Sequence, residues 1–226
     1  MIDPERRKFE NLLRKRGTRL NGNSGIERDI LARYQDSCTV LVMDTSGFTR
    51  LTQKHGIIHF LALVVAMQDI VKPIIARHHA LGYWGEADNI YATFPNARWA
   101  VQCALEMQRV LAHANKLRTP ESRLAVCIGI GSGRMLRIGA CDCFGDPMNQ
   151  ACKLGEDIAK AGEILLTADT YAEIETQAVG LKLLAKHAEL SGVKLDYFEV
   201  VQKGKVRWKP AAPKRKTTPC SSGLTT

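Results

Sequence analysis

Short apolar runs separated by polar turns fill the middle of this chain, and this pattern is typical of alternating strands and helices. The apolar run at 40–43 is followed by Asp, Thr, Ser and Gly, and a helical pattern begins at 48. We therefore predict a buried strand, a polar turn and an apolar helix that reaches Ala80, with a kink or end at Pro73. Apolar residues lie on almost every face of this helix, so we expect one face in the core and another in a subunit interface.

The remaining pattern predicts alternating elements up to residue 201. The expected elements are a hairpin at 83–94 with its turn at Asp88-Asn89, a helix at 98–117, a strand at 124–130, a turn at 131–133 leading to a short strand that ends near 138, a helix within 145–161, a strand at 164–166, a helix at 168–177, and strands at 181–184 and 197–201. The order β-α-β-β-α-β, followed by further helical and strand segments, predicts a ferredoxin-like α+β core.

The two ends differ in composition from the middle of the chain. A basic helix is expected at 5–16, followed by a glycine- and asparagine-rich linker at 17–25 and a short helix leading into the first strand. We divide the chain into an N-terminal basic helical extension with its linker (1–35), one domain (36–202) and a disordered basic tail (203–226). Because the extensions contain none of the motif residues discussed below, we expect them to be dispensable for the chemistry.

Positive charge is concentrated at these ends. The net charge is +9, and residues 1–20 hold seven basic and three acidic residues, while 203–226 hold seven basic and no acidic residues. The segment between them is therefore slightly acidic, which argues against a nucleic-acid partner for the folded domain. The basic termini are suited to a weak contact with an acidic membrane surface or a protein, and the alternative is a solvated appendage.

Several other classes of protein are disfavoured by the sequence. No apolar run is expected to span a membrane, and the charged first residues do not resemble a signal peptide. Seven cysteines without an export signal are typical of reduced thiols, so we expect a cytoplasmic protein. No set of histidines and cysteines has the spacing of a zinc finger.

Asp44 is the first residue that suggests chemistry. A carboxylate at the end of a buried strand is costly unless it is paired, and a divalent cation is a common partner. Gly47 lets the backbone approach a ligand, and the N–H groups of the following helical turn suit phosphate. This stretch therefore indicates a metal and polyphosphate site, and the alternative is an ordinary strand–turn–helix corner with a capping Asp.

Three stretches together carry a family resemblance: V-M-D-T-S-G-F-T at 42–49, G-E-A-D-N-I-Y-A-T-F at 85–94, and C-D-C-F-G-D-P-M-N-Q-A-C-K-L-G-E at 141–156. In this order they resemble the class III adenylate/guanylate (nucleotidyl) cyclase catalytic domain, over roughly residues 36–200. The resemblance implies a mostly antiparallel sheet flanked by helices, in a head-to-tail homodimer with active sites at the interface. It also implies closure of a nucleoside triphosphate, ATP by default, into a 3′,5′-cyclic nucleotide and pyrophosphate.

The resemblance also implies roles for single residues. Asp44 and Asp88 match the carboxylates that hold two Mg²⁺ or Mn²⁺ ions in each active site, and Thr45 matches a backbone carbonyl ligand of the metal. The other matching positions are the phosphate-binding Gly47, Phe48 and Thr49, the ribose-positioning Asn149, the transition-state cation Lys153, and the base-binding Asp142 and Trp84.

Three positions depart from the family pattern. Trp84 stands where the family has a base-recognising lysine, Ala87 replaces a glycine, and Lys153 replaces an arginine. Lys153 keeps the charge without the bidentate fork of arginine, so we expect weakened catalysis. Trp84 either stacks on a base or packs in an interface. The open alternatives are therefore a cyclase with altered base specificity, for a pyrimidine or GTP, and a catalytically weak nucleotide-binding regulatory module.

Overall fold

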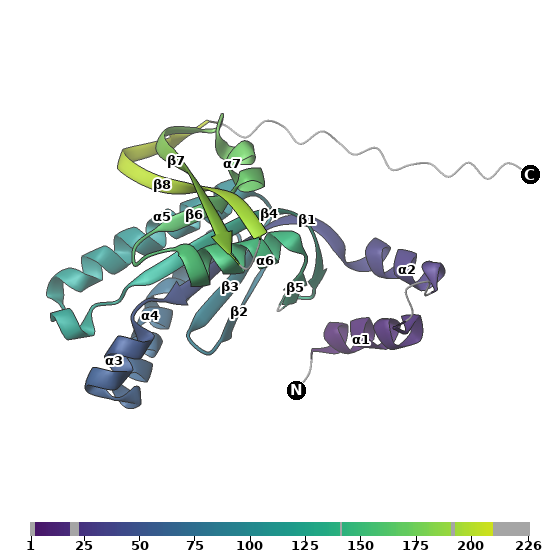
Figure 1. Cartoon of the computed structure of the whole chain (residues 1–226), viewed down its shortest axis with the longest axis horizontal. Coiled ribbons are helices and arrows are strands. Elements are labelled where there is room, and N and C mark those ends of the chain that lie inside the picture. The colour runs from purple at the N-terminus through teal and green to yellow at the C-terminus, as the bar shows by residue number, and fades with distance from the viewer. Residues whose placement is uncertain (1–2, 19–22, 141, 191–192, 210–226) are drawn as a thin grey trace, which may run out of the picture.

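The computed structural model describes residues 3–18, 23–140, 142–190 and 193–209 (Figure 1). The helices are α1 (Pro4–Arg16), α2 (Ser24–Tyr34), α3 (Phe48–His55), α4 (Ile57–Arg77), α5 (Ala97–Ala114), α6 (Asp146–Cys152) and α7 (Ala168–Ile174), with two 3₁₀ segments, η1 (Asn115–Leu117) and η2 (Pro120–Ser122), and a π-helix, η3 (Lys153–Ile158). The strands are β1 (Gln35–Thr45), β2 (Gly82–Glu86), β3 (Asn89–Phe94), β4 (Val126–Ile138), β5 (Asp142–Phe144), β6 (Ile164–Thr167), β7 (Ala178–Leu190) and β8 (Val193–Trp208).

The strands form one sheet in the order β2-β3-β1-β4-β6-β8-β7, and β5 pairs with β4 outside this path. Only β4 and β6 run parallel among the described pairings. The first four strands, with α4 after β1 and α5 after β3, make a β-α-β-β-α-β unit. The expected α+β fold with a mostly antiparallel sheet flanked by helices is therefore confirmed.

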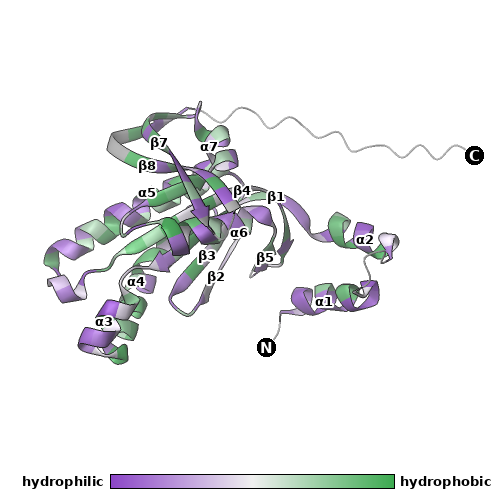
Figure 2. Cartoon of the chain, viewed as in Figure 1, coloured by the Kyte–Doolittle hydropathy of each residue, from purple (hydrophilic) through white to green (hydrophobic). Residues whose placement is uncertain are grey.

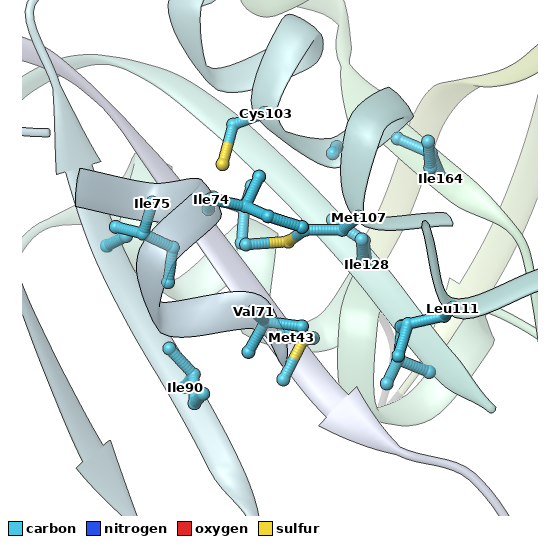
Figure 3. Packing of buried hydrophobic residues seen from close by; sticks show 14 of the residues in the cluster. Met43, Val71, Ile74, Ile75, Ile90, Cys103, Met107, Leu111, Ile128 and Ile164 are labelled. Carbon is cyan, nitrogen blue, oxygen red and sulfur yellow. The ribbon is translucent and has the colours of Figure 1, made fainter. Parts of the chain in front are cut away.

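Alternation along β1 sends its side chains into two different clusters. Leu41 and Met43 are fully buried in the main core, which also contains residues of the helices α4, α5 and α7. Figure 3 shows Met43 among buried residues of α4 and α5. Val40 and Val42 point to the opposite face, where they pack with Ala151 of α6. Asp44 follows Val42 in this alternation, so it lies on the face that carries α6.

The prediction of a turn at 131–133 is wrong, because β4 runs without a break from Val126 to Ile138. The glycines of this stretch have a packing role instead. A Cβ atom added to Gly129 would lie 2.1 Å from the carbonyl oxygen of Ala151, and one added to Gly131 would lie 2.2 Å from that of Pro147. The glycines therefore let the backbone of α6 rest directly on the sheet.

The apolar stretch forms two helices, α3 and α4, that meet at Gly56. Pro73 does not end α4, which continues to Arg77. Contrary to the sequence expectation, α4 is long and apolar enough to cross a membrane by length and composition, and a third of its most apolar window is buried within the fold. Its buried face packs on the sheet, while several apolar side chains on other faces are exposed; these are Ile57, Ile58, Leu61 and Val65. Figure 2 shows hydrophobic residues, in green, along α4.

Both ends of the described chain are more ordered than expected. Phe9 of α1 is buried against Ile30 and Tyr34 of α2 and Ile138 of β4. The N-terminal helix is therefore packed on the domain and is not a solvated appendage. At the other end β8 continues to Trp208, so the first residues assigned to a disordered tail form part of a strand, and residues 210–226 lie outside the described chain.

Candidate functional site

The two candidate metal carboxylates come together at the C-terminal end of β1. Asp44 and Thr45 end this strand, and Asp88 lies in the hairpin between β2 and β3. The hydroxyl of Thr45 donates a hydrogen bond to the backbone carbonyl oxygen of Asp88 at 3.2 Å. This contact holds the hairpin turn beside the end of β1, although 43 residues separate the two positions.

Asp44 is in an environment that penalises its charge. Burial raises its pKa from the ordinary 3.8 to about 6, and the neighbouring charges of Asp88 and Glu156 act in the same direction. A backbone hydrogen bond from Thr45 offsets part of this effect. A carboxyl group that is costly to ionise and faces a second acid gains free energy from a bound cation.

The hairpin turn differs by one residue from the expectation. The sequence predicted Asp88-Asn89 as the turn, whereas Asn89 begins β3 and the turn consists of Ala87 and Asp88. Ala87 has φ = 53°, in the left-handed region that favours glycine. This conformation costs about 1–2 kcal/mol of backbone strain, at the residue directly before the candidate metal ligand Asp88.

The donor set fits a hard divalent cation. Asp44 and Asp88 supply carboxylate oxygens, and the side-chain oxygen of Asn89 is buried beside them without a hydrogen-bond partner in the described part of the chain. Within the same residues, no group of three or more His, Cys, Asp or Glu side chains could hold a metal ion. Mg²⁺ commonly binds through one or two carboxylates and takes its other ligands from substrate phosphates and water, so two carboxylates are sufficient.

The candidate phosphate loop follows at the start of α3. Gly47 is the N-cap residue with φ = 95°, and no side chain caps the helix. The N–H groups of the first turn are therefore available to an anion. Phe48 packs edge-on against Phe60 of α4 at 4.7 Å between ring centroids, and this contact fixes the start of the helix, while Thr49 is exposed.

Asn149 and Lys153 lie on one face of a helical segment, as the sequence predicted. The backbone N–H of Lys153 donates to the carbonyl oxygen of Asn149 at the end of α6. Asn149 is exposed and Lys153 is partly exposed, and neither side chain has a hydrogen bond to another described residue. Both side chains are therefore free to contact a substrate.

A π-helix, η3, begins at Lys153, and local periodicity gave no sign of it. Gly155 presses against the sheet, where an added Cβ would lie 3.0 Å from the Val42 carbonyl oxygen. The carboxylate of Glu156 then accepts hydrogen bonds from Tyr91 at 3.2 Å and from the Asn89 side chain at 3.1 Å. Glu156 thus joins the segment of Lys153 to the strand that follows Asp88, and π-turns are frequent at functional sites.

The two candidate base-binding residues have unequal surroundings. Trp84 is directly opposite Tyr91 in the hairpin and stacks on it, with 5.4 Å between ring centroids and 16° between planes. Asp142 begins β5, and its carboxylate binds Arg6 of α1. Sequence analysis missed Arg6 because it lies in the extension that was expected to be dispensable.

Comparisons with known proteins identify the family of the chain. The family model described as "Adenylate and Guanylate cyclase catalytic domain" matches residues 30–199. A Rhizobium meliloti (strain 1021) protein named "Putative adenylate cyclase 3" is 23% identical over 128 residues, which are 57% of this chain and 22% of that protein. The chain thus spans about a fifth of the length of this curated relative.

Solved structures show the same fold. An adenylate/guanylate cyclase/hydrolase from Silicibacter pomeroyi aligns with a TM-score of 0.65 and 21% identity, over 75% of this chain and 98% of that one. The adenylyl cyclase CyaB from P. aeruginosa aligns with a TM-score of 0.62 and 20% identity, over 76% and 96% of the two chains. Since the family model covers most of the chain, this protein belongs to the family of adenylate and guanylate cyclase catalytic domains.

Proposed function

We propose that this protein is a nucleotidyl cyclase that converts a nucleoside triphosphate, ATP by default, into a 3′,5′-cyclic nucleotide and pyrophosphate. The observation that carries the proposal is the pairing of Asp44 with Asp88 at the end of β1, fixed by the Thr45 hydrogen bond. Two carboxylates placed beside a glycine turn and a free helix N-terminus suit a metal-bound triphosphate. Family membership supports the same reaction class.

In this reaction the 3′-oxygen of the ribose forms a bond to the α-phosphorus, and the bond between that phosphorus and the bridging oxygen of pyrophosphate breaks. The hydroxyl proton passes to solvent. Asp44, Asp88 and the Thr45 carbonyl would hold two Mg²⁺ or Mn²⁺ ions, which supply Lewis-acid activation of the hydroxyl and charge neutralisation when bound.

The remaining residues would bind and orient the substrate. Backbone N–H groups at 47–49 hold the phosphates, and Asn149 positions the ribose. Lys153 places a positive charge near the phosphorus, where negative charge increases in the transition state. Its single ammonium group is less well matched to phosphate than a guanidinium fork, so turnover should be slower than with arginine.

We further propose that the active site is composite and forms in a head-to-tail homodimer. Exposed apolar residues on α4 favour a second copy of the chain as partner, because such groups are costly in water. The side chains of Asn149 and Lys153, which have no described hydrogen-bond partner in their own chain, would then serve the metal site of the other subunit.

The two candidate base-binding residues favour different substrates. Asp142 favours ATP, because a carboxylate accepts from the adenine amino group. Trp84 favours a looser selection, because an aromatic ring stacks on any base. A second candidate function is therefore cyclisation of another triphosphate, including a pyrimidine nucleotide.

The decisive experiment incubates the full chain and Mn²⁺ with each of the four ribonucleoside triphosphates and identifies products by mass spectrometry. We expect a cyclic product from at least one of them. The Asp44→Ala and Asp88→Ala variants should form no product, and an unchanged circular dichroism spectrum should show that each variant is folded. Binding without any cyclic product would support the regulatory-module alternative. Undiminished product from either mutant would exclude the metal mechanism.

A further inference from the structure

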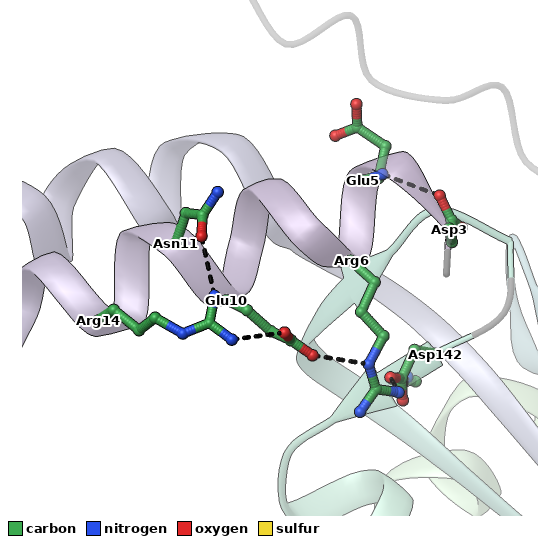
Figure 4. A network of polar contacts seen from close by, with 8 residues as sticks. Asp3, Glu5, Arg6, Glu10, Asn11, Arg14 and Asp142 are labelled. Atoms are coloured by element: carbon green, nitrogen blue, oxygen red, sulfur yellow. Dashed lines mark hydrogen bonds and ion pairs between the residues drawn. The ribbon is translucent and has the colours of Figure 1, made fainter. Parts of the chain in front are cut away.

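Arg6 of α1 donates a hydrogen bond through Nη1 to the Oδ2 atom of Asp142 and forms an ion pair with it (Figure 4). We propose that Arg6 is a specificity-determining residue of the base subsite, where it supplies the charged N–H donor that Trp84 does not provide. The inference rests on the proposed function, since it takes Asp142 as the residue that reads the base. Arg6 lies outside residues 30–199, which match the family.

The position of Arg6 is fixed by the packing of α1. Phe9, one turn further along the helix, is only 6% exposed and stacks on Phe144 at 6.0 Å between ring centroids. Phe144 is in the same short strand as Asp142, so this contact docks α1 directly on β5. Glu10 accepts a second hydrogen bond from the Nε of Arg6 at 3.3 Å (Figure 4). The guanidinium is thus oriented from two sides.

The Arg6–Asp142 pair offers a donor next to an acceptor. The Oδ1 atom of Asp142 accepts from the backbone N–H of Cys143 at 3.0 Å, and burial raises the pKa of this carboxyl while the charge of Arg6 lowers it. Arg6 therefore favours the ionised form that accepts hydrogen bonds. Its Nη2 has no partner among the described residues, so N–H donors remain for a ring nitrogen or carbonyl oxygen.

Trp84 lies on the face of β2 that is turned toward this pair. Gly82, Trp84 and Glu86 share one face of the strand because side chains alternate along it. A Cβ added to Gly82 would lie 2.2 Å from the carbonyl oxygen of Ala140, and the charge of Glu86 acts on Asp142. The aromatic platform and the charged pair therefore border the same region, as expected for two parts of one base subsite.

Arg6→Ala tests the proposal, with Arg14→Ala as the matched control. Arg14 is on the same helix and also binds Glu10, but it has no hydrogen bond to Asp142. We expect Arg6→Ala to lower the ratio of kcat/KM between the best and the other triphosphates by about tenfold or more, because one hydrogen bond to a base edge is lost. Arg6→Lys should restore part of the ratio, and Arg14→Ala should leave it unchanged.

An unchanged ratio in Arg6→Ala would overturn the inference. If that unchanged ratio came with an equal rise of kcat/KM for all substrates, α1 would be an obstruction of the site and not part of the base subsite. Dissociation constants for the four triphosphates, measured by calorimetry with Ca²⁺, provide a second readout that does not require turnover. If wild type forms no cyclic product, the proposed function fails, while a change of these binding ratios in Arg6→Ala still supports the role of Arg6. Unchanged binding ratios would reject that role independently.

Discussion

The hydroxyl of Tyr91 donates a hydrogen bond to the carboxylate of Glu156 at 3.2 Å, across 65 residues of sequence. Tyr91 stacks on Trp84 with its ring and is part of β3, while Glu156 lies in the π-helix that begins at Lys153. One contact thus connects the candidate base platform, the strand after Asp88 and the candidate transition-state cation. We infer that Glu156 positions these groups relative to one another.

The first prediction follows from this link. Tyr91→Phe should cost about 1 kcal/mol of stability, the usual net value of one hydrogen bond, and Glu156→Gln should reduce kcat more than it raises KM. A double-mutant cycle between the two should give a coupling free energy of about 0.5–1 kcal/mol from thermal unfolding. Additive effects on both stability and kcat would contradict a shared role.

Asp44→Asn should change the dependence of stability on pH. The folded pKa of Asp44 is about 6, above its ordinary value of 3.8, so the folded state retains a proton that the unfolded state loses between these values. Stability should fall as pH rises through this window and stay lower above it, by about 1–2 kcal/mol after allowance for solvent screening.

Metal-free Asp44→Asn should therefore unfold at a higher temperature than wild type at pH 8, and the difference should vanish near pH 4. Mn²⁺ should raise the Tm of wild type more at pH 8 than at pH 5, and should raise that of the variant much less. Lower stability of metal-free Asp44→Asn at pH 8 would show that the carboxylate is not strained by burial.

Composite active sites can be tested by mixing two inactive variants. Asp44→Ala and Asn149→Ala proteins, combined after subunit exchange, should recover up to about a quarter of wild-type activity, because a heterodimer has one site free of both substitutions. Exchange is checked by mass spectrometry of differently tagged chains. Activity at background level despite confirmed exchange would place each site within a single chain.

Trp84→Lys tests the origin of base selection. If Trp84 borders the base, the new ammonium should raise the ATP-to-CTP ratio of kcat/KM by roughly tenfold to 150-fold, the value of about 1–3 kcal/mol for a hydrogen bond to a desolvated base edge. The competing role is packing against Tyr91 and in a dimer interface. In that case all substrates should lose rate together as the dimer dissociation constant rises.

Ala87→Gly should relieve backbone strain at the metal hairpin. Since Ala87 has φ = 53°, glycine should increase stability by about 0.5–1 kcal/mol despite its larger unfolded-state entropy. The same substitution at Ala112, an exposed helical position of α5 away from the proposed interface, should instead destabilise by about 1 kcal/mol. Differential scanning calorimetry of both variants gives the comparison, and equal losses of stability would mean that the turn conformation is not strained.

Local sequence determined much of this protein. Periodicity predicted most helices and strands near their observed positions. The spacing of apolar residues shows which face of each element is buried, and this spacing is visible in the local sequence. The turn at Gly47 was also predictable, since tight turns have strong residue preferences. The pairing of Asp44 with Asp88 was expected from the family resemblance and not from local pattern. The continuity of β4 through Gly131 was not predictable. The glycines of this stretch are needed for the close packing of α6 on the strand, and they do not form a turn.

Only the tertiary structure decided the surroundings of the site. Arg6 binds Asp142, which is 136 residues away in the sequence. Glu156 binds Tyr91 from a π-helix that the periodicity of the sequence does not predict. Such contacts depend on how separate elements pack, and a basic helix or a single acid gives no local signal of its distant partner. The sequence, through its family resemblance, therefore indicated the carboxylates and the type of chemistry. The fold then placed α1 and the π-helix in contact with candidate site residues, because docking one element on another is a non-local property.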